Sequence, residues 1–84
     1  MTRESIFKKV SKIITDYLGD EVEAEIAMDC GLRDRLGMDS MDVLYVVFMI
    51  ENTFNICVES EKLETFTTVG DLVDIVQEKC KKIV

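Results

Sequence analysis

Hydrophobic residues recur at the spacing of an α-helix along most of this chain, and no stretch shows the alternation of a convincing β-strand. The first helical pattern covers about Arg3–Tyr17, and Gly19 provides its C-terminal stop. A second pattern starts at Asp39 or Ser40 and ends near Phe54. We therefore expect an all-α protein.

Two shorter patterns follow the second helix and complete a predicted four-helix bundle. The segment Ser60–Thr65 indicates a brief third helix. The fourth helix begins with Thr68 as its N-cap and has Asp71 three positions later. Its buried stripe is expected to consist of Val69, Leu72, Val73, Val76, Cys80 and Ile83.

A long loop, Asp20–Asp39, separates the first two helices and is acidic and irregular. A loop of this length in a compact domain is usually functional or tightly packed. We expect it to be anchored on the bundle by scattered hydrophobic residues, namely Ile26, Met28, Leu32 and Leu36.

The second helix is hydrophobic around most of its circumference, so its core face has to be chosen. We place the core of the protein on Phe7, Val10, Ile14, Leu44, Val47, Ile50, Phe54, Leu72, Val73 and Val76. The opposite side of the second helix then carries a strip that begins next to Ser40 and consists of Met41, Tyr45, Phe48 and Asn52. An exposed apolar strip usually binds a partner, although a helix that is apolar all round can also be buried on both sides. We favour partner contact.

Composition limits the classes of protein to which this chain can belong. Its 84 residues suffice for one domain, and 48% hydrophobic residues without proline predict an ordered chain. Residues 1–15 carry four bases against one acid, whereas residues 16–39 carry eight acids against two bases. The acidic part should repel nucleic acid and attract basic protein surfaces. No signal peptide is visible, and the longest apolar run, Val43–Ile50, is too short to cross a membrane.

The three cysteines, Cys30, Cys57 and Cys80, are far apart and lack the spacing of a zinc site. We expect reduced thiols that pack mostly as small core residues, as in a cytoplasmic protein. No metal site is expected.

Ser40 stands between Asp39 and Asp42, where the acidic loop enters the second helix. The chain has no histidine to activate this hydroxyl, and it shows no cysteine–base pair or glycine-rich phosphate loop, so we expect no enzymatic activity. Modification of Ser40 by another enzyme is more plausible, because a helix N-terminus favours an attached anion by about 0.3–1 kcal/mol. Asp39 and Asp42 resemble a capping box with aspartate in the usual glutamate place. The alternative is that Ser40 is only a helix cap.

Three motifs fall at the ends of the predicted second and fourth helices: Leu36-Gly37-Met38-Asp39-Ser40-Met41-Asp42, Glu51 with Phe54, and Phe66-Thr67-Thr68-Val69-Gly70-Asp71-Leu72. In this arrangement the chain resembles the acyl carrier protein family over nearly its whole length. The resemblance implies that Ser40 accepts 4′-phosphopantetheine from coenzyme A through a separate phosphopantetheinyl transferase. The thiol of this arm would carry acyl groups as thioesters between acyl-processing enzymes of fatty acid, polyketide or related biosynthesis. Residues 1–84 would form a single carrier domain, and the protein would be a cytoplasmic monomer.

The chain departs from the pattern of the fatty acid synthesis members on its second helix. Tyr45 stands where an acid is usual, and Asn52 and Thr53 occupy later acidic positions. Arg35 replaces the acidic or amide residue that commonly precedes Leu-Gly. We therefore expect a more apolar partner-binding face, made of Asp39, Met41, Asp42, Tyr45 and Phe48, and these departures put recognition by the general fatty acid enzymes in doubt.

Two other functions remain open from the sequence. A carrier of amino acid or peptide thioesters can also show Asp-Ser-Met, although the acidic charge and the single domain favour acyl cargo. An unmodified helical adaptor would use Ser40 only as a cap and bind its partner through the apolar strip. The mass of the chain after incubation with coenzyme A and a transferase separates the modified from the unmodified classes.

Overall fold

The described part of the chain folds into three α-helices and one short 3-10 helix: α1 (Arg3–Leu18), α2 (Ser40–Phe54), η2 (Ser60–Thr65) and α3 (Val69–Lys81). The computed structural model describes residues 2–19 and 26–81, with the backbone alone at residues 60, 64 and 81. The predicted all-α fold is confirmed. The expected third helix is a 3-10 helix instead, because six residues allow few turns and short segments tolerate the tighter form. The described bundle therefore contains three α-helices rather than four.

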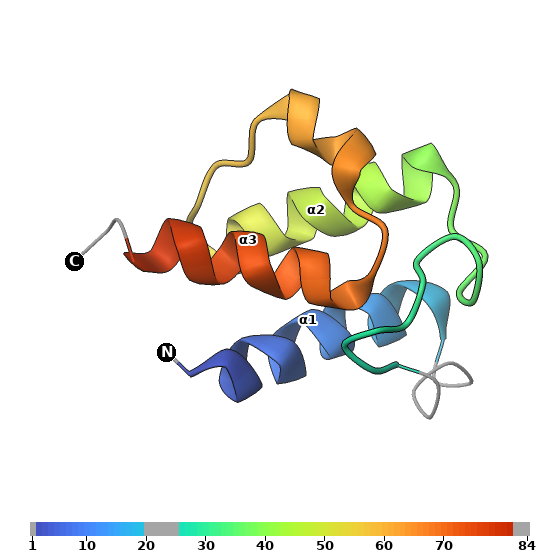
Figure 1. Cartoon of the computed structure of the whole chain (residues 1–84), viewed down its shortest axis with the longest axis horizontal. Helices are drawn as coiled ribbons and strands as arrows, with labels where there is room; N and C mark the ends of the chain where they lie inside the picture. Colours follow the sequence, from blue (N-terminus) through green and yellow to red (C-terminus); the bar gives the residue numbers. More distant parts are fainter. Residues whose placement is uncertain (1, 20–25, 82–84) are drawn as a thin grey trace.

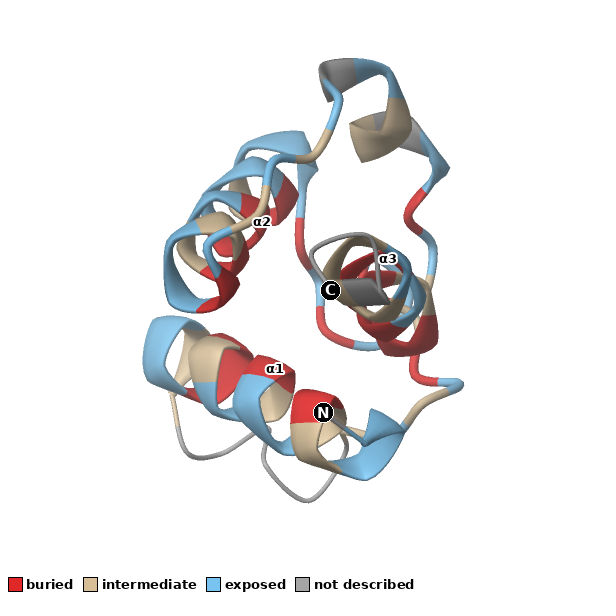
Figure 2. Cartoon of the chain, turned by 90° about the vertical axis from the view of Figure 1, so that its left-hand side faces the viewer, coloured by how far each residue is buried: buried red, intermediate tan, exposed pale blue. Residues whose placement is uncertain are grey.

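The helices surround one core. Figure 2, which views the molecule nearly along the helix axes, shows the buried faces of α1, α2 and α3 turned toward one another. The C-terminal end of α1 and the N-terminal ends of α2 and α3 lie at the same end of the molecule (Figure 1). The start of α2, which carries Ser40, is therefore close to the ends of both other helices.

The helix ends follow the capping pattern of the sequence. At the end of α1, Gly19 has φ 105° and donates its N–H to the Thr15 carbonyl at 2.7 Å. At the start of α3, the Asp71 N–H donates to the Thr68 hydroxyl at 3.3 Å, and the Thr68 N–H donates back to the Asp71 carboxylate at 3.0 Å. Both predicted boundaries are confirmed.

Most of the predicted core is buried, namely Val10, Ile14, Val47, Ile50, Phe54, Leu72, Val73 and Val76. Phe7 is only half-buried at the edge of this cluster. In the predicted stripe of the last helix, Val69 is buried and Cys80 is half-buried, whereas Ile83 lies outside the described residues. Of the cysteines only Cys30 is buried, and Cys57 is exposed, so the expectation of core thiols fails for Cys57.

The prediction that Leu44 belongs to the core is wrong, because 44% of its surface is exposed. The buried face of α2 consists of Val43, Val46, Val47, Ile50 and Phe54. These residues follow the spacing i, i+3, i+4, i+7 and i+11 of one helical face. Leu44 is one position beyond Val43, a rotation of about 100°, and so it joins the outer surface.

The loop before α2 is held against the start of α3 by backbone hydrogen bonds. Gly70 donates to the Met28 carbonyl at 2.7 Å, Val69 donates to Cys30 at 3.0 Å, and Leu32 donates to Thr67 at 2.8 Å. An isolated bridge, not a strand, joins these segments within the described residues. The burial of hydrophobic side chains of the loop supports its contact with the rest of the bundle.

Among the four predicted anchors of this loop, Leu32 and Leu36 are buried, and Ile26 and Met28 are half-buried. Met38 is also buried, with 2% of its surface exposed, although the sequence did not single it out. Residues 20–25 of the predicted loop lie outside the described part. The anchored segment fixes the chain up to the residue before the N-cap of α2.

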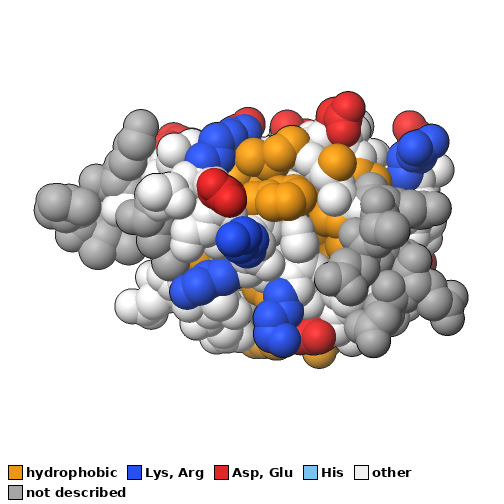
Figure 3. Space-filling model, turned by 90° about the horizontal axis from the view of Figure 1, so that it is seen from below, with side chains coloured by type: hydrophobic (Ala, Val, Ile, Leu, Met, Phe, Trp, Pro, Cys, Tyr) orange, Lys and Arg blue, Asp and Glu red, His pale blue; other side chains and the backbone are white. Residues whose placement is uncertain are grey.

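The charge asymmetry of the sequence is visible on the surface. Lys and Arg side chains gather on the face over α1 that is seen from below (Figure 3), and Lys8, Lys9 and Lys12 are exposed. Ion pairs join Arg3 of α1 to Asp74 of α3 at 2.5 Å and Lys79 to Glu59 at 2.7 Å. The side chains of the Arg3–Asp74 pair are 43% and 60% exposed, and an ion pair as exposed as this contributes little to stability. None of the described helices is long and apolar enough to cross a membrane.

We predict that Gly70→Ala lowers the free energy of unfolding by about 1–3 kcal/mol, as expected for an overpacked site. A Cβ atom at this position would lie 2.8 Å from the Met28 carbonyl oxygen, which is backbone and cannot swing away. Urea denaturation followed by circular dichroism measures the loss. Gly31→Ala is the matched control, because its Cβ meets its nearest neighbour at 3.4 Å. Equal losses in the two variants would contradict the close approach.

Candidate functional site

The start of α2 is closed by a reciprocal capping box. The Asp42 N–H donates to the Asp39 carboxylate at 2.9 Å, and the Asp39 N–H donates to the Asp42 carboxylate at 3.0 Å. Asp39 has an extended backbone, as an N-cap residue should, and α2 begins at Ser40. The aspartate variant of the capping box is confirmed, and the cap is Asp39 rather than Ser40.

Ser40 is therefore not needed as the helix cap. Its side chain is exposed, and its hydroxyl has no hydrogen-bond partner among the described residues. The N–H groups of Ser40 and Met41 also have no acceptor within that part of the chain. In an α-helix the first N–H groups have no intrahelical partner, so this end is suited to a negatively charged group.

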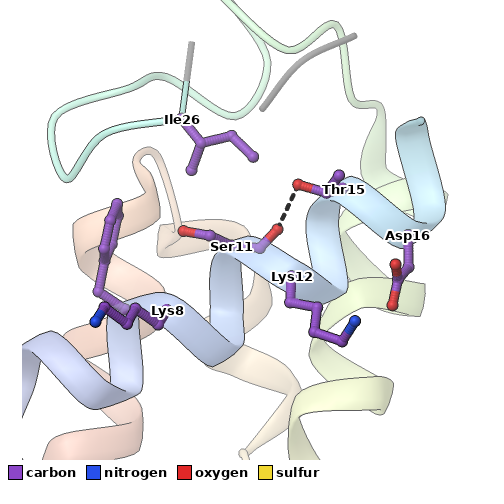
Figure 4. A pocket seen from close by; sticks show the side chains of 7 residues that line it. Lys8, Ser11, Lys12, Thr15, Asp16 and Ile26 are labelled. Atoms are coloured by element: carbon purple, nitrogen blue, oxygen red, sulfur yellow. Dashed lines mark hydrogen bonds between the residues drawn. The ribbon is translucent and has the colours of Figure 1, made fainter. Parts of the chain in front are cut away.

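Ser11 of α1 contrasts with Ser40, because its hydroxyl is not accessible. A hollow of about 500 Å³ lies along α1 and is lined by Phe7, Lys8, Ser11, Lys12, Thr15, Asp16 and Ile26. Figure 4 shows Ile26 projecting toward α1 and the Thr15 hydroxyl donating to the Ser11 carbonyl oxygen, a bond of 2.8 Å. The Ser11 hydroxyl oxygen is buried without a partner among the described residues. An enzyme can reach the hydroxyl of Ser40 but not that of Ser11.

Two tyrosines lie beside the capping box. The Tyr17 hydroxyl, at the end of α1, donates to the second carboxylate oxygen of Asp42 at 2.5 Å. The Tyr17 ring stacks on Tyr45 of α2, with 4.6 Å between centroids and 24° between planes. Sequence reasoning assigned no role to Tyr17, because an amphipathic residue near a helix end gives no signal of its partner across the bundle.

These contacts explain two shifted pKa values. The hydrogen bond from Tyr17, followed by that from the Asp39 N–H, lowers the pKa of Asp42 below its ordinary 3.8. The same bond to Asp42 raises the pKa of the Tyr17 phenol above 10.0, and the nearby acids Asp42 and Asp39 raise it further. At neutral pH the contact therefore joins a neutral phenol to an ionised carboxylate.

An apolar strip runs along the outer side of α2 from the residue next to Ser40. Its side chains are exposed by 70% at Met41, 44% at Leu44, 47% at Tyr45 and 57% at Phe48. Asn52 is exposed farther along the helix. The predicted outward direction of Met41, Tyr45 and Phe48 is confirmed, and Leu44 widens the strip. Asp39 is exposed and Asp42 is half-buried at the head of this face.

The arrangement has room for a covalently attached phosphodiester. Ser40 offers an accessible oxygen, and the N–H groups of Ser40 and Met41 would face an anion there. No base is hydrogen-bonded to the hydroxyl among the described residues. Within the same residues, no group of three or more potential ligands is placed to hold a metal ion.

Comparison with known proteins gives a consistent result. Residues 8–76 match the family model described as a phosphopantetheine attachment site. The chain is 44% identical over 77 residues to an acyl carrier protein of Streptococcus pyogenes serotype M3, which covers 92% of this chain and 99% of that protein. It is 38% identical over 78 residues to an acyl carrier protein of Thermotoga maritima, with 93% and 95% covered. A crystal structure of an acyl carrier protein from Thermotoga maritima matches with a TM-score of 0.86 and 29% identity, over 98% of this chain and 94% of that one.

We predict that Asp39→Ala lowers the free energy of unfolding by about 0.5–2 kcal/mol, the usual effect of losing an N-cap. Ser40→Ala should change it by less than about 0.5 kcal/mol, because an exposed hydroxyl without a partner contributes little. Urea denaturation of both variants at neutral pH makes the comparison. A larger loss for Ser40→Ala would show that the serine is the cap.

Proposed function

The chain belongs to the acyl carrier protein family, and we propose that Ser40 is the residue to which its 4′-phosphopantetheine arm is attached. The thiol at the end of this arm carries acyl groups as thioesters. The observation that carries the assignment is the division of roles at the start of α2. Asp39 and Asp42 make the cap, which leaves the hydroxyl of Ser40 exposed and without a partner among the described residues.

The chemistry of attachment divides between two proteins. The Ser40 oxygen forms a new bond to phosphorus of coenzyme A, the adenosine-containing part leaves, and the hydroxyl proton has to be taken up. The chain contains no histidine, and no base contacts this oxygen within the described residues. We infer that a phosphopantetheinyl transferase supplies the base, so the chain is a substrate in this step.

The described residues support a single carrier domain. Every described helix contributes to, or packs against, one hydrophobic cluster. The loop before α2 joins that cluster through Leu32, Leu36 and Met38. Ser40 thus follows closely on a segment that is packed into the core.

A partner-binding face follows from the apolar strip. We propose that Asp39, Met41, Asp42, Tyr45 and Phe48 contact the transferase and the acyl-processing enzymes. A strip that begins beside Ser40 lies where an enzyme working on the attached group has to approach. Large exposed apolar side chains in a row are unusual on a protein that binds nothing.

The attachment is tested by mass. Incubation with coenzyme A and a broad-specificity transferase should add one phosphopantetheine to the wild type and none to Ser40→Ala. Ser5→Ala is a matched control, because Ser5 also lies in the first turn of a helix, and it should be modified like the wild type. Circular dichroism should show unchanged helix content in both variants. Modification of Ser40→Ala would refute the assignment, and an unmodified wild type would favour the helical adaptor.

The partner face is tested at Phe48, which is the cleaner of the two aromatic positions because Tyr45 also stacks on Tyr17. Phe48→Ala should raise the KM of the loading reaction about fivefold or more, which corresponds to about 1 kcal/mol or more for an interface anchor. Its thermal midpoint should stay near that of the wild type, because most of the side chain is exposed.

Thr53→Ala serves as the control and should leave the KM near the wild-type value, since Thr53 is an exposed residue of the same helix outside the strip. Added salt should leave the ratio of the Phe48→Ala and wild-type KM values unchanged, because screening acts on charges and not on buried aromatic area. An unchanged KM, or a lowered midpoint in its place, would remove Phe48 from the partner face.

A further inference from the structure

Both oxygens of the Asp42 carboxylate are engaged, and they connect different parts of the molecule. One oxygen accepts the N–H of Asp39 and so closes the capping box. The other accepts the hydroxyl of Tyr17. Asp42 therefore couples the end of α1 to the first turn of α2.

Tyr17 contacts α2 in two ways, because its ring also stacks on Tyr45, one turn beyond the capping box. Among the described residues, the Tyr17–Asp42 bond is the side-chain hydrogen bond that joins α1 to α2. A ring stack and a hydrogen bond on one side chain restrain both its position and its rotation. The first turn of α2 is therefore held from outside as well as by its own cap.

We infer that Tyr17 is a positioning residue for the attachment site: through Asp42 and Tyr45 it holds the first turn of α2, and hence Ser40, in the arrangement that the transferase modifies. This inference rests on the proposed role of Ser40. Tyr17 acts through its neighbours, and nothing in its geometry requires it to touch the reacting atoms.

The charge of the attached group gives Tyr17 a second effect. A phosphodiester on Ser40 adds a negative charge between Asp39 and Asp42, both of which are acids. Like charges at close range disfavour the ionised carboxylate. The phenol of Tyr17 donates to Asp42 and so offsets part of this repulsion, because a hydrogen bond to the charged form favours that form. The contact therefore helps to keep Asp42 ionised after attachment as well as before it.

The pH range of the contact follows from its two partners. The pKa of Asp42 is lowered in the folded chain, so the stabilisation is present above the ordinary value of 3.8 and is lost as pH falls through the lowered value. The pKa of Tyr17 is raised, so the stabilisation is present below 10.0 and is lost as pH rises through the raised value. The titratable groups around the phenol are Asp42, Asp39 and Tyr45. Asp16 lines a small hollow, of about 170 Å³, together with Tyr17 and Tyr45. At neutral pH the contact is fully formed.

The test compares Tyr17→Phe with Tyr45→Phe. Tyr17→Phe keeps the stacked ring and removes the donor to Asp42. Tyr45→Phe removes the hydroxyl from the other ring of the stack, and this hydroxyl has no hydrogen bond among the described residues. Titration of the Asp42 carboxyl carbon by nuclear magnetic resonance, before and after attachment, gives its pKa. The initial rate of attachment at low chain concentration gives kcat/KM for the transferase.

We expect Tyr17→Phe to raise the pKa of Asp42 above its wild-type value, both before and after attachment at Ser40. We expect kcat/KM to fall about two- to tenfold, the effect of losing one hydrogen bond that positions the first turn of α2. Tyr45→Phe should leave the pKa of Asp42 as in the wild type. Ser5→Ala, which removes a hydroxyl at the opposite end of α1, should leave kcat/KM as in the wild type.

Equal Asp42 pKa values in the two variants would overturn the inference, as would a raised pKa in Tyr17→Phe with an unchanged kcat/KM. These outcomes differ from failure of the proposed function. If Ser40 is not the attachment residue, Ser40→Ala is still modified, or the wild type is not modified at all, whatever the pKa of Asp42. In either case the positioning role of Tyr17 would be refuted together with the proposed role of Ser40.

Discussion

The structure depends on the backbone hydrogen bonds that join residues 28–32 to residues 67–70. They hold an irregular acidic segment against the start of α3, where no regular element would otherwise fix it. Leu32, Leu36 and Met38 then bury their side chains in the common core. The last residue of this anchored segment is followed directly by the N-cap of α2. The place of Ser40 is thus set by contacts of a loop, and the helix only continues from it.

The site combines two acids whose carboxylates accept hydrogen bonds with one serine hydroxyl that has no partner among the described residues. Asp39 and Asp42 use their carboxylates on each other's N–H groups and on Tyr17, so their charges stabilise the fold locally. The serine between them takes no part in this network within the described residues. A residue that contributes little to stability can be modified without disturbing the bundle, which is a requirement for a carrier that exists with and without its arm.

The sequence was sufficient where short-range chemistry decides the outcome. Gly19 and Thr68 mark helix ends through their own backbone or hydroxyl groups, and the Asp39–Asp42 spacing predicts the capping box. It was insufficient where the outcome depends on other elements. The sequence did not show which face of α2 is buried, because the helix is apolar nearly all round. Leu44 was therefore placed in the core. The Tyr17–Asp42 contact spans 25 positions and depends on how α1 and α2 pack, which no local pattern encodes.

The stacked pair also has an optical consequence. The chain has two tyrosines and no tryptophan, and both tyrosines stand at the junction of α1 and α2 beside Ser40. Its tyrosine fluorescence and the long-wavelength part of its near-ultraviolet circular dichroism therefore originate at this one place, with ring-to-ring coupling set by the stack. The unlabelled protein carries its own reporter of the junction, and its intrinsic spectrum describes the surroundings of Ser40 rather than the average state of the fold.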